Sequence, residues 1–384
     1  MSLEREVGSS TAGATLSSMK RAFAAVAMVA AVAVVTACVK PGPGNSELAA
    51  ERNATATGFS DTAETVMGTL TAPPSARFLA RIRNGKMGGV VLLGNGWLSQ
   101  STATTVTAKL QQAACTRGEP LMIAVDQEGG LVRRLYWAPP TEAPAFMSNA
   151  ADAHAQAAGA AGALHSVGID VDLAPVLDTP GSAHSFLGSR AFSQSRTRNA
   201  TLGRAFVDGL QTNGIAATTK HFPGLGLASG NTDHGRIVIR AAAWKLRQGL
   251  LPFESAIKAG VKLVMLSTAV YPNLDASGKP AAFSSKIATG LLRQTLGFKG
   301  VTITDSLTAP AADRIPHTAT RAMLAGSDLL IFGAESASER GYATLLADSP
   351  EMPRLRGRIT VAASRIRALK AWSATHGGPA CTTG

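Results

Sequence analysis

The sequence predicts an α/β fold, a single (β/α)8 barrel of the TIM type. Short β-branched or Leu-rich runs alternate with Ala-rich helical stretches along the chain, which is typical of a parallel sheet. Eight such runs can be counted, and eight strands close this kind of barrel. No internal repeat or heptad pattern interrupts the order, so we expect one domain to hold most of the chain.

The expected strands span residues 65–70, 89–93, 121–126, 169–174, 216–220, 262–267, 301–304 and 328–332. The first is the weakest, because residues 55–76 are poor in large apolar side chains and contain Pro73 and Pro74. A doubly wound open sheet therefore stays open as an alternative.

Helical stretches of suitable length lie between these strands, and a last basic helix follows the eighth. They span residues 101–115, 150–166, 197–213, 251–259, 284–296, 318–324 and 354–372. Several end at a glycine just before the next strand, which predicts left-handed helix termini at Gly168, Gly214, Gly260 and Gly300.

The N-terminus indicates export. A basic pair at residues 20–21 precedes an apolar run over 22–35 that is short for a membrane span and typical of a signal-peptide core. The segment Val35-Thr36-Ala37-Cys38 resembles a bacterial lipobox, whose cysteine is lipidated; an ordinary signal peptide with an incidental cysteine is the alternative. We expect a protein that is exported and lipid-anchored through Cys38 to the outer face of the cytoplasmic membrane or within the cell envelope.

These features divide the chain into four parts. Residues 1–37 are expected to be a signal peptide, whose first 18 residues fit a mis-assigned start, and 38–54 a tether rich in Pro, Gly, Ser and Asn. The barrel domain is expected over 55–375 and a tail over 376–384. Cys115 and Cys381 allow a disulfide in an exported protein, although their distance cannot be deduced from sequence.

The charge balance indicates which classes of partner the protein could bind. There are 37 basic and 25 acidic residues, a net charge of +12, which suits nucleic acid, anionic lipid or an acidic wall polymer. No block of five like charges occurs, so a diffusely basic surface is the simpler interpretation. Aromatic and basic residues do not interleave as they do in proteins that bind single-stranded nucleic acid. We therefore expect no nucleic-acid partner.

Polar residues gather where the expected strands end. Asp126 ends the third strand, Lys220 and His221 end the fifth and Asp305 ends the seventh, while Arg134 and Arg190 lie in the loops that follow the third and fourth. The carboxyl ends of barrel strands form the catalytic rim of this fold. After the fifth strand, a loop over 227–235 carries Asp233 and His234.

A carboxylate such as Asp305, kept ionised by nearby cations, is suited to attack on an anomeric carbon. Retaining glycosidases need such a nucleophile and a proton donor about 5 Å away, which the loop with Asp233 and His234 could supply. The histidines lack the spacing of a catalytic zinc site, and the glycines at 224–230 lack that of a dinucleotide loop. We expect no metal and no cofactor.

Five motifs together resemble glycoside hydrolase family 3, and more narrowly the bacterial β-N-acetylglucosaminidases (β-N-acetylhexosaminidases) of peptidoglycan turnover in their lipoprotein form. They are Ile123–Gly130, Leu173–Asp178, Gly188–Phe192, Lys220–Gly224 and Thr304–Leu307. The resemblance implies a (β/α)8 barrel, retention of configuration and release of terminal β-linked N-acetylglucosamine. It also implies Asp305 as nucleophile and, as sugar-binding groups, Asp126, Arg134, Arg190, Lys220 and His221.

The chain departs from the family at one point. An Asp-x-His pair usually follows the strand-five motif, with the histidine as acid/base; this chain has Asn231-Thr232-Asp233 there and His234 one residue later. Either Asp233 is the proton donor, or a one-residue slip lets His234 act with Asp233 beside it. We favour the second, because an imidazole can both give and take a proton near neutral pH. A histidine donor would also let phosphate compete with water as acceptor.

Two rival functions remain. Since fold does not fix substrate, the chain could be a β-glucosidase or another family 3 exo-glycosidase. From another class, a wall- or sugar-binding lipoprotein without turnover fits the altered loop. The partners expected are cell-wall glycan fragments and, through the lipid, a membrane, with the protein itself a monomer.

Overall fold

The structure, a computed structural model, describes residues 59–381. The expected signal peptide, Cys38 and the tether lie outside the described residues. Within residues 59–381 no helix is long and apolar enough to cross a membrane.

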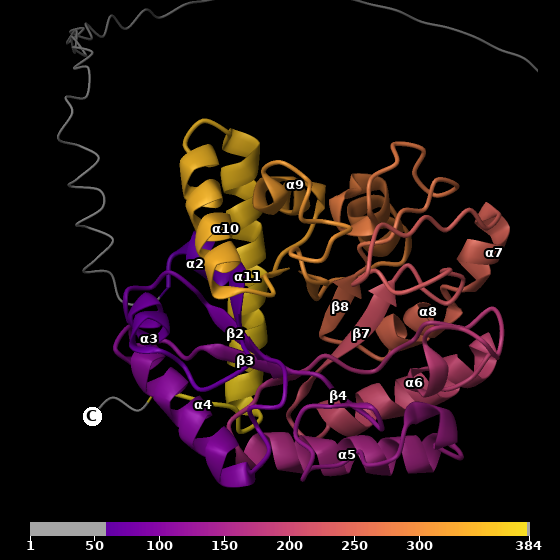
Figure 1. The fold of residues 1–384 in the computed structure, drawn as a ribbon, viewed down its shortest axis with the longest axis horizontal. Coiled ribbons are helices and arrows are strands. Elements are labelled where there is room, and N and C mark those ends of the chain that lie inside the picture. Colours follow the sequence, from indigo (N-terminus) through magenta and orange to yellow (C-terminus); the bar gives the residue numbers. More distant parts are fainter. Residues whose placement is uncertain (1–58, 382–384) are drawn as a thin grey trace, which may run out of the picture. The chain divides into compact units, whose positions relative to one another are not determined.

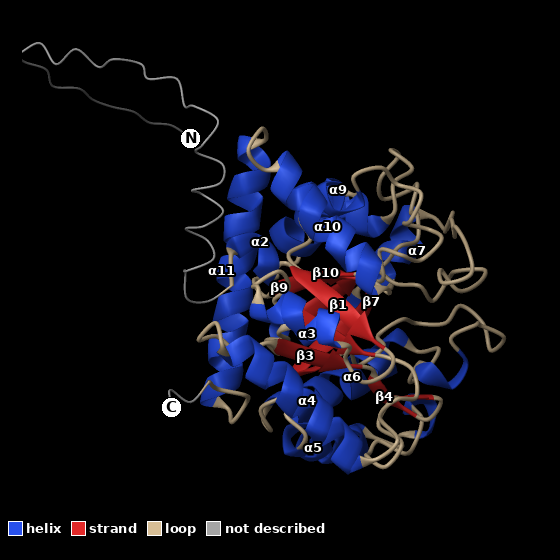
Figure 2. Cartoon of the chain, turned by 60° about the vertical axis from the view of Figure 1, so that its left-hand side comes forward, coloured by secondary structure: helices blue, strands red, loops and turns tan. Residues whose placement is uncertain are grey.

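Eight parallel strands form the barrel that the sequence predicts. They pair in the order β10-β1-β2-β3-β6-β7-β8-β9, and a parallel bridge between Ile303 and Leu329 joins the two ends of the sheet. Figure 2 shows the strands in the centre with helices around them. The prediction of a barrel is confirmed, and the open sheet is excluded because this bridge connects the two end strands, β9 and β10. The strands are β1 Val66–Leu70, β2 Gly89–Leu92, β3 Met122–Val125, β6 Val171–Asp172, β7 Ala216–Phe222, β8 Leu263–Leu266, β9 Val301–Thr304 and β10 Leu330–Ile331.

The helices that surround the barrel include the expected ones, which agree to within a few residues, and four that were not expected, at 61–64, 76–83, 243–248 and 335–348. The helices are α2 Asp61–Glu64, α3 Ala76–Arg83, α4 Gln100–Cys115, α5 Ala150–Ser166, α6 Arg196–Gln211, α7 Ala243–Gln248, α8 Leu251–Lys258, α9 Thr318–Ala325, α10 Glu335–Asp348 and α11 Pro353–Thr375. The stretch expected over 284–296 forms a π-helix, η4 Lys286–Thr295. Short 3₁₀ turns occur at η1 Pro144–Phe146, η2 Gly188–Arg190 and η3 Ala281–Phe283.

Left-handed helix termini were predicted at four glycines and are found at three of them. Gly168, Gly214 and Gly260 have φ values of 71°, 81° and 79°, in the left-handed region. Gly300 does not, so that prediction was wrong; the left-handed residue after η4 is Gly297, with φ 74°. Glycine at 300 has another cause, because a Cβ there would lie 2.3 Å from the carbonyl oxygen of Lys262.

The core has two layers, as expected for parallel strands buried on both faces. One lies inside the barrel and includes Met67, Met122 and Met265. The other, much larger, lies between the strands and the outer helices. Ile366 and Leu369 of α11 pack on the inner layer, so the last helix covers part of the barrel interior.

Ion pairs attach the last helix to the rest of the fold. Buried Asp328 accepts hydrogen bonds from Arg358 at 3.0 Å and Arg365 at 2.9 Å, and it also pairs with Arg293. Near the start of the described chain, Lys370 contacts buried Glu64 at 2.8 Å. Figure 1 shows α11 beside α2, so the two ends of the domain meet.

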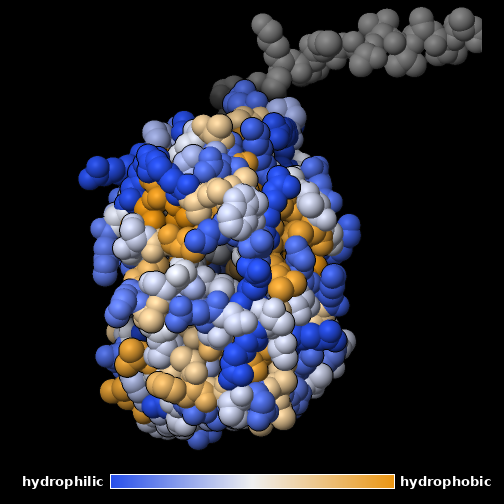
Figure 3. All heavy atoms as spheres, turned by 90° about the vertical axis from the view of Figure 1, so that its right-hand side faces the viewer, coloured by the Kyte–Doolittle hydropathy of each residue, from blue (hydrophilic) through white to orange (hydrophobic). Residues whose placement is uncertain are grey.

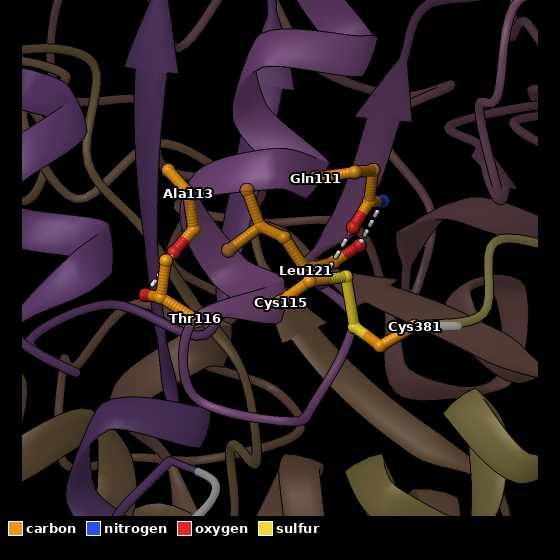
Figure 4. The surroundings of a disulfide bond; sticks show 6 residues. All are labelled: Gln111, Ala113, Cys115, Thr116, Leu121 and Cys381. Atoms are coloured by element: carbon orange, nitrogen blue, oxygen red, sulfur yellow. Dashed lines mark hydrogen bonds between the residues drawn. A yellow bond between two sulfur atoms is a disulfide. The ribbon is translucent and has the colours of Figure 1, made fainter. Parts of the chain in front are cut away.

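The disulfide that the sequence left open is formed. Cys115, at the end of α4, is bonded to Cys381, with Cα atoms 5.3 Å apart and a sequence separation of 266. Figure 4 shows the bond next to Leu121, whose backbone exchanges two hydrogen bonds with the Gln111 side chain. The tail after α11 is thereby attached to α4.

The outer surface is mixed in polarity. Figure 3 shows the face that carries α7, where hydrophobic residues form separate patches among hydrophilic ones. Long loops gather on one side of the barrel, at the right of Figure 2, where the hairpin of β4 Gln127–Gly129 and β5 Val132–Arg133 follows β3. These loops form the carboxyl-terminal rim of the barrel.

Candidate active site

A polar cavity of about 280 Å³ opens at the carboxyl ends of the strands. Seven of the eight predicted site residues line it, which confirms that separate strands converge here; they are Asp126, Arg134, Arg190, Lys220, His221, Asp233 and Asp305. Apolar side chains from the barrel interior, such as Met265 and Ile331, also line the cavity. The eighth predicted residue, His234, lines a neighbouring cavity instead.

Lys220 and His221 both line the cavity although they are consecutive in β7. Side chains of a regular strand alternate between its faces. The pairing of β7 with β8 shifts register between Thr219 and Phe222, and such an irregularity re-aims a side chain. The motif at the end of this strand therefore supplies both a cation and an imidazole to the cavity.

Two carboxylates hold Lys220 in place. Its Nζ lies 2.6 Å from Asp126 Oδ1 and 2.5 Å from Glu128 Oε1. Glu128 also receives two hydrogen bonds from Arg190, at 2.7 and 2.8 Å. Burial alone would raise the pKa of Glu128, but Lys220 and Arg190 lower it to about 2, so it is ionised at neutral pH.

Glu128 was not among the predicted site residues. It lies in a segment expected to be a loop, and the short β4–β5 hairpin that presents it has no clear alternation of polar and apolar residues. A buried acid next to two glycines was the available signal. Its carboxylate contacts both Lys220 and Arg190 and so holds the two cations at the cavity.

His221 is oriented by a second residue that the prediction left out. Its Nδ1 lies 2.7 Å from Asp178 Oδ2, and Asp178 also accepts a hydrogen bond from the backbone N–H of Leu225 at 2.6 Å. Asp178 is fully buried and follows β6. One carboxylate thus fixes both the imidazole and the turn that begins the next loop.

Arg134 enters the cavity from the segment after β5. Its backbone N–H donates to the carbonyl of Asp126 at 3.1 Å, which fixes the start of the side chain. Its buried Nε has no hydrogen-bond partner among residues 59–381. A buried cationic donor without a partner is costly, so this arrangement suits a polar ligand in the cavity.

Asp305 follows β9 directly. Its backbone N–H donates to Leu266 of β8 at 3.0 Å, and one of its carboxylate oxygens accepts from the Ser306 N–H at 2.7 Å. Burial raises the pKa of Asp305 above its ordinary value; His221 opposes this shift and Asp233 adds to it. The carboxylate is therefore coupled electrostatically to two other residues that line the cavity.

The loop after β7 separates Asp233 from His234. The Asp233 N–H donates to Asn231 Oδ1 at 3.0 Å, and the His234 N–H donates to the Asn231 carbonyl at 3.2 Å, which makes a tight turn. In this turn Asp233 lines the cavity of Asp305, whereas His234 does not. The structure thus brings together Asp305 and Asp233 and leaves His234 outside.

The described residues 59–381 contain no group of three or more His, Cys, Asp or Glu side chains arranged to hold a metal ion. What the cavity offers is the half-buried carboxylate of Asp305, the carboxylate of Asp233, and hydrogen-bond donors on Lys220, Arg134 and His221. Donors of this kind suit the hydroxyl and amide groups of a sugar, and paired carboxylates suit glycoside hydrolysis.

Comparisons with known proteins agree with this chemistry. The chain matches the Glycosyl hydrolase family 3 N terminal domain over residues 64–369. It is 35% identical to a protein of Arthroderma benhamiae described as an uncharacterized secreted glycosyl hydrolase, over 70% of this chain and 79% of that protein. It is 31% identical to a beta-hexosaminidase of Nitrosomonas eutropha, over 72% of this chain and 83% of the relative.

Two solved structures are also similar. A family 3 β-N-acetylglucosaminidase from Paenibacillus sp. str. FPU-7 superimposes with a TM-score of 0.78 at 30% identity, over 84% of this chain and 64% of that one. A β-N-acetylhexosaminidase from Beutenbergia cavernae gives a TM-score of 0.76 at 30% identity, over 81% of this chain and 97% of that one. The barrel, the converging polar residues and the family match agree with one another. The chain is therefore a glycoside hydrolase and belongs to family 3.

Proposed function

We propose that the protein is a retaining exo-β-N-acetylhexosaminidase that releases terminal β-linked N-acetylglucosamine. The observation that carries the proposal is the carboxylate of Asp305 in a polar cavity of about 280 Å³. This volume is small for a ligand site and suits one sugar ring rather than the middle of a glycan chain. The choice of N-acetylglucosamine is supported by the relatives, since those similar to this chain include proteins named beta-hexosaminidase.

In this proposal Asp305 attacks the anomeric carbon and forms a glycosyl-enzyme intermediate. Lys220, Asp126, Arg190 and Arg134 bind the hydroxyl and amide groups of the sugar. His221, aligned by Asp178, lies close enough to Asp305 to lower its pKa and thus helps to keep the nucleophile ionised.

We assign the proton donor to Asp233 rather than His234. This reverses the preference drawn from the sequence, and its support is that Asp233 and Asp305 line one cavity while His234 lines another. Asp233 would protonate the leaving oxygen and then activate water for the second step. With a carboxylate donor we expect water, not phosphate, as the acceptor.

The activity is tested with 4-nitrophenyl N-acetyl-β-glucosaminide and the matching β-glucoside. We expect faster turnover of the first, and a loss of roughly 10³-fold or more in kcat for Asp305→Asn. Proton NMR of the first-formed sugar should show the β-anomer. Preference for the glucoside would favour the rival glycosidase, and ligand binding without any turnover would favour a non-catalytic sugar-binding protein.

The proton donor is tested with Asp233→Ala and His234→Ala on two leaving groups. A 2,4-dinitrophenyl glycoside needs little protonation, whereas a methyl glycoside needs it fully. We expect Asp233→Ala to slow the methyl glycoside far more than the dinitrophenyl one, and azide to restore turnover of the activated substrate. If His234→Ala shows this selectivity instead, the assignment is reversed.

We further propose that the substrates are cell-wall glycan fragments and that the protein is anchored by lipid on Cys38. The support is the lipobox-like segment before Cys38 and the net charge of +12, which favours acidic wall polymers. Radiolabelled palmitate should enter the full chain but not a Cys38→Ala variant, which should leave the membrane fraction. Equal labelling of both would contradict the anchor.

A further inference from the structure

A second, larger cavity lies beside the sugar-binding one. Its volume is about 890 Å³, and its walls come from the loops after β7, β8 and β9 together with α9 and the first turn of α11 (Figure 1). Pro280, Phe283, Ile315 and Leu324 give it apolar surface. It could therefore hold a ligand considerably larger than a single sugar ring.

The polar lining of this cavity is cationic. No Asp or Glu lines it, whereas its basic side chains, apart from His234, are Arg236, Lys279, Arg314, Arg321 and Arg354. Cations gathered in one cavity repel one another unless an anion is present.

None of these five side chains forms an ion pair with a carboxylate among residues 59–381. Elsewhere the chain neutralises clustered arginines internally, as where Asp328 takes Arg293, Arg358 and Arg365. The cavity lacks such a carboxylate, so the compensating charge has to come from outside the chain.

The two cavities share two loops. In the loop after β7, Asp233 lines the sugar cavity, and His234 and Arg236 line the basic one. In the segment after β9, Asp305 and Ser306 line the sugar cavity, and Arg314 and its neighbours line the basic one. A molecule that extends past Asp233 out of the sugar cavity therefore comes next to the cations.

In a retaining glycosidase the proton donor lies on the side of the leaving group. The aglycone must therefore extend past the residue that gives the proton. From this geometry we propose that the basic cavity is the aglycone site and that the preferred aglycone carries a carboxylate. The inference rests on the proposed function, and it adds the charge of the leaving group to the identity of the sugar.

The test uses two disaccharides that differ in one carboxylate, namely N-acetylglucosamine joined β-1,4 to N-acetylglucosamine or to N-acetylmuramic acid. The measured quantity is the ratio of kcat/KM for the anionic to the neutral substrate. We expect the wild-type ratio to exceed one and to fall about tenfold in Arg314→Gln/Arg321→Gln, since hydrogen bonds to charged groups are strong. Raising the salt concentration should lower the wild-type ratio.

A charge-matched control is Arg83→Gln/Arg340→Gln, which removes two exposed arginines of α3 and α10 that line neither cavity. This control should keep the wild-type ratio. A ratio that is unchanged in the cavity variant, or that falls equally in the control, overturns the anionic aglycone site. Because the ratio compares two substrates on one protein, a partly unfolded variant does not change it.

The same assay separates the two proposals. If the wild type hydrolyses the neutral disaccharide but shows no preference for the anionic one, the aglycone site fails while the proposed function stands. If neither disaccharide nor the nitrophenyl N-acetylglucosaminide is hydrolysed, the proposed function itself fails.

Discussion

Asp305 and Asp233 line the same cavity, and the charge of Asp233 affects the proton affinity of Asp305. The negative charge of Asp233 raises the pKa of Asp305, in addition to the larger effect of burial. A nucleophile must be ionised to attack, so this coupling affects the acid limb of the pH profile. A proton donor at 233 has the opposite requirement and must be protonated when the first step begins.

Replacing Asp233 by Asn removes the charge that raises the pKa of Asp305. With an activated 2,4-dinitrophenyl substrate, which needs little acid catalysis, we expect the acid limb of kcat/KM to move to lower pH. The control Asp313→Asn, an exposed carboxylate that lines neither cavity, should leave the limb in place. A limb that moves to higher pH in Asp233→Asn would contradict the coupling.

Glu128 affects stability as well as the site, because it is buried between two cations. Its pKa falls from 4.5 to about 2 on folding, so it stabilises the fold above pH 4.5 and loses this effect as the pH falls toward 2. We expect Glu128→Gln to lower the free energy of unfolding by about 3 kcal/mol at pH 7, since it leaves buried cations undercompensated. The difference from wild type, measured by urea denaturation, should shrink between pH 4.5 and 2; a constant difference would count against this explanation.

At the scale of elements, the loop after β7 is fixed at its base. Gly226 packs so closely against the segment after β6 that a Cβ would lie 1.8 Å from the Thr179 carbonyl oxygen. The Gly181 N–H donates to the Gly226 carbonyl at 2.9 Å. The turn that carries Asp233 therefore starts from a defined position on the barrel.

Gly226→Ala should displace this loop, because the clash is with backbone and cannot be relieved by a side-chain rotation. We expect a loss of about 1–3 kcal/mol in stability and a fall in kcat. Gly230→Ala, in the same loop, is the matched control, since its Cβ would meet only Ile237 Cδ1 at 3.8 Å. Calorimetry and turnover of the nitrophenyl glycoside measure both effects. Equal behaviour of the two variants would show that the contact at Gly226 is unimportant.

The sequence predicts these elements well because buried parallel strands are short apolar runs and leave a strong signal. All eight expected strands form, and the residues at the ends of β3, β7 and β9 converge as expected. The β4–β5 hairpin and α2, α3, α7 and α10 were not anticipated; of these, the hairpin strands, α2 and α7 are too short to show a clear periodicity. Glu128 and Asp178 were missed as site residues for a related reason: their roles depend on contacts with Arg190, Lys220 and His221, which are distant in sequence.

The acid/base residue could not be predicted from the sequence for a different reason. Asp233 and His234 are adjacent, so spacing alone could not decide which one lines the cavity. The turn stabilised by Asn231 directs the two side chains to different cavities, and this depends on the backbone conformation of a loop. Loops of this kind, rich in Gly, Ser and Asn, adopt many conformations that their sequence does not distinguish.

At the scale of the whole molecule, the domain is closed on itself. Helix α11 is joined to the first described helix through Lys370 and Glu64 and through Arg367 and Asp61, both pairs at 2.8 Å. The disulfide between Cys115 and Cys381 adds a covalent connection to the same end of the chain. Ends that are joined in this way resist local opening.

The two cysteines are 266 positions apart in sequence, so their disulfide restricts the unfolded chain considerably. We expect Cys115→Ser/Cys381→Ser to lower the free energy of unfolding by about 2–5 kcal/mol, measured by thermal or urea denaturation. Reduction of the wild type should have a similar effect, and reduction of the variant should have none. Equal stability of wild type and variant would mean that the bond does not form in the folded protein.

The position of this bond also determines what a protease can do. Asp126, Lys220, Asp233 and Asp305 all fall between the two linked cysteines, inside one covalent ring. A single cut at an exposed rim loop would open the ring without releasing a fragment, and both halves of the catalytic machinery would stay on one molecule. Such a nicked enzyme would migrate as two pieces only after its sulfur bridge had been reduced.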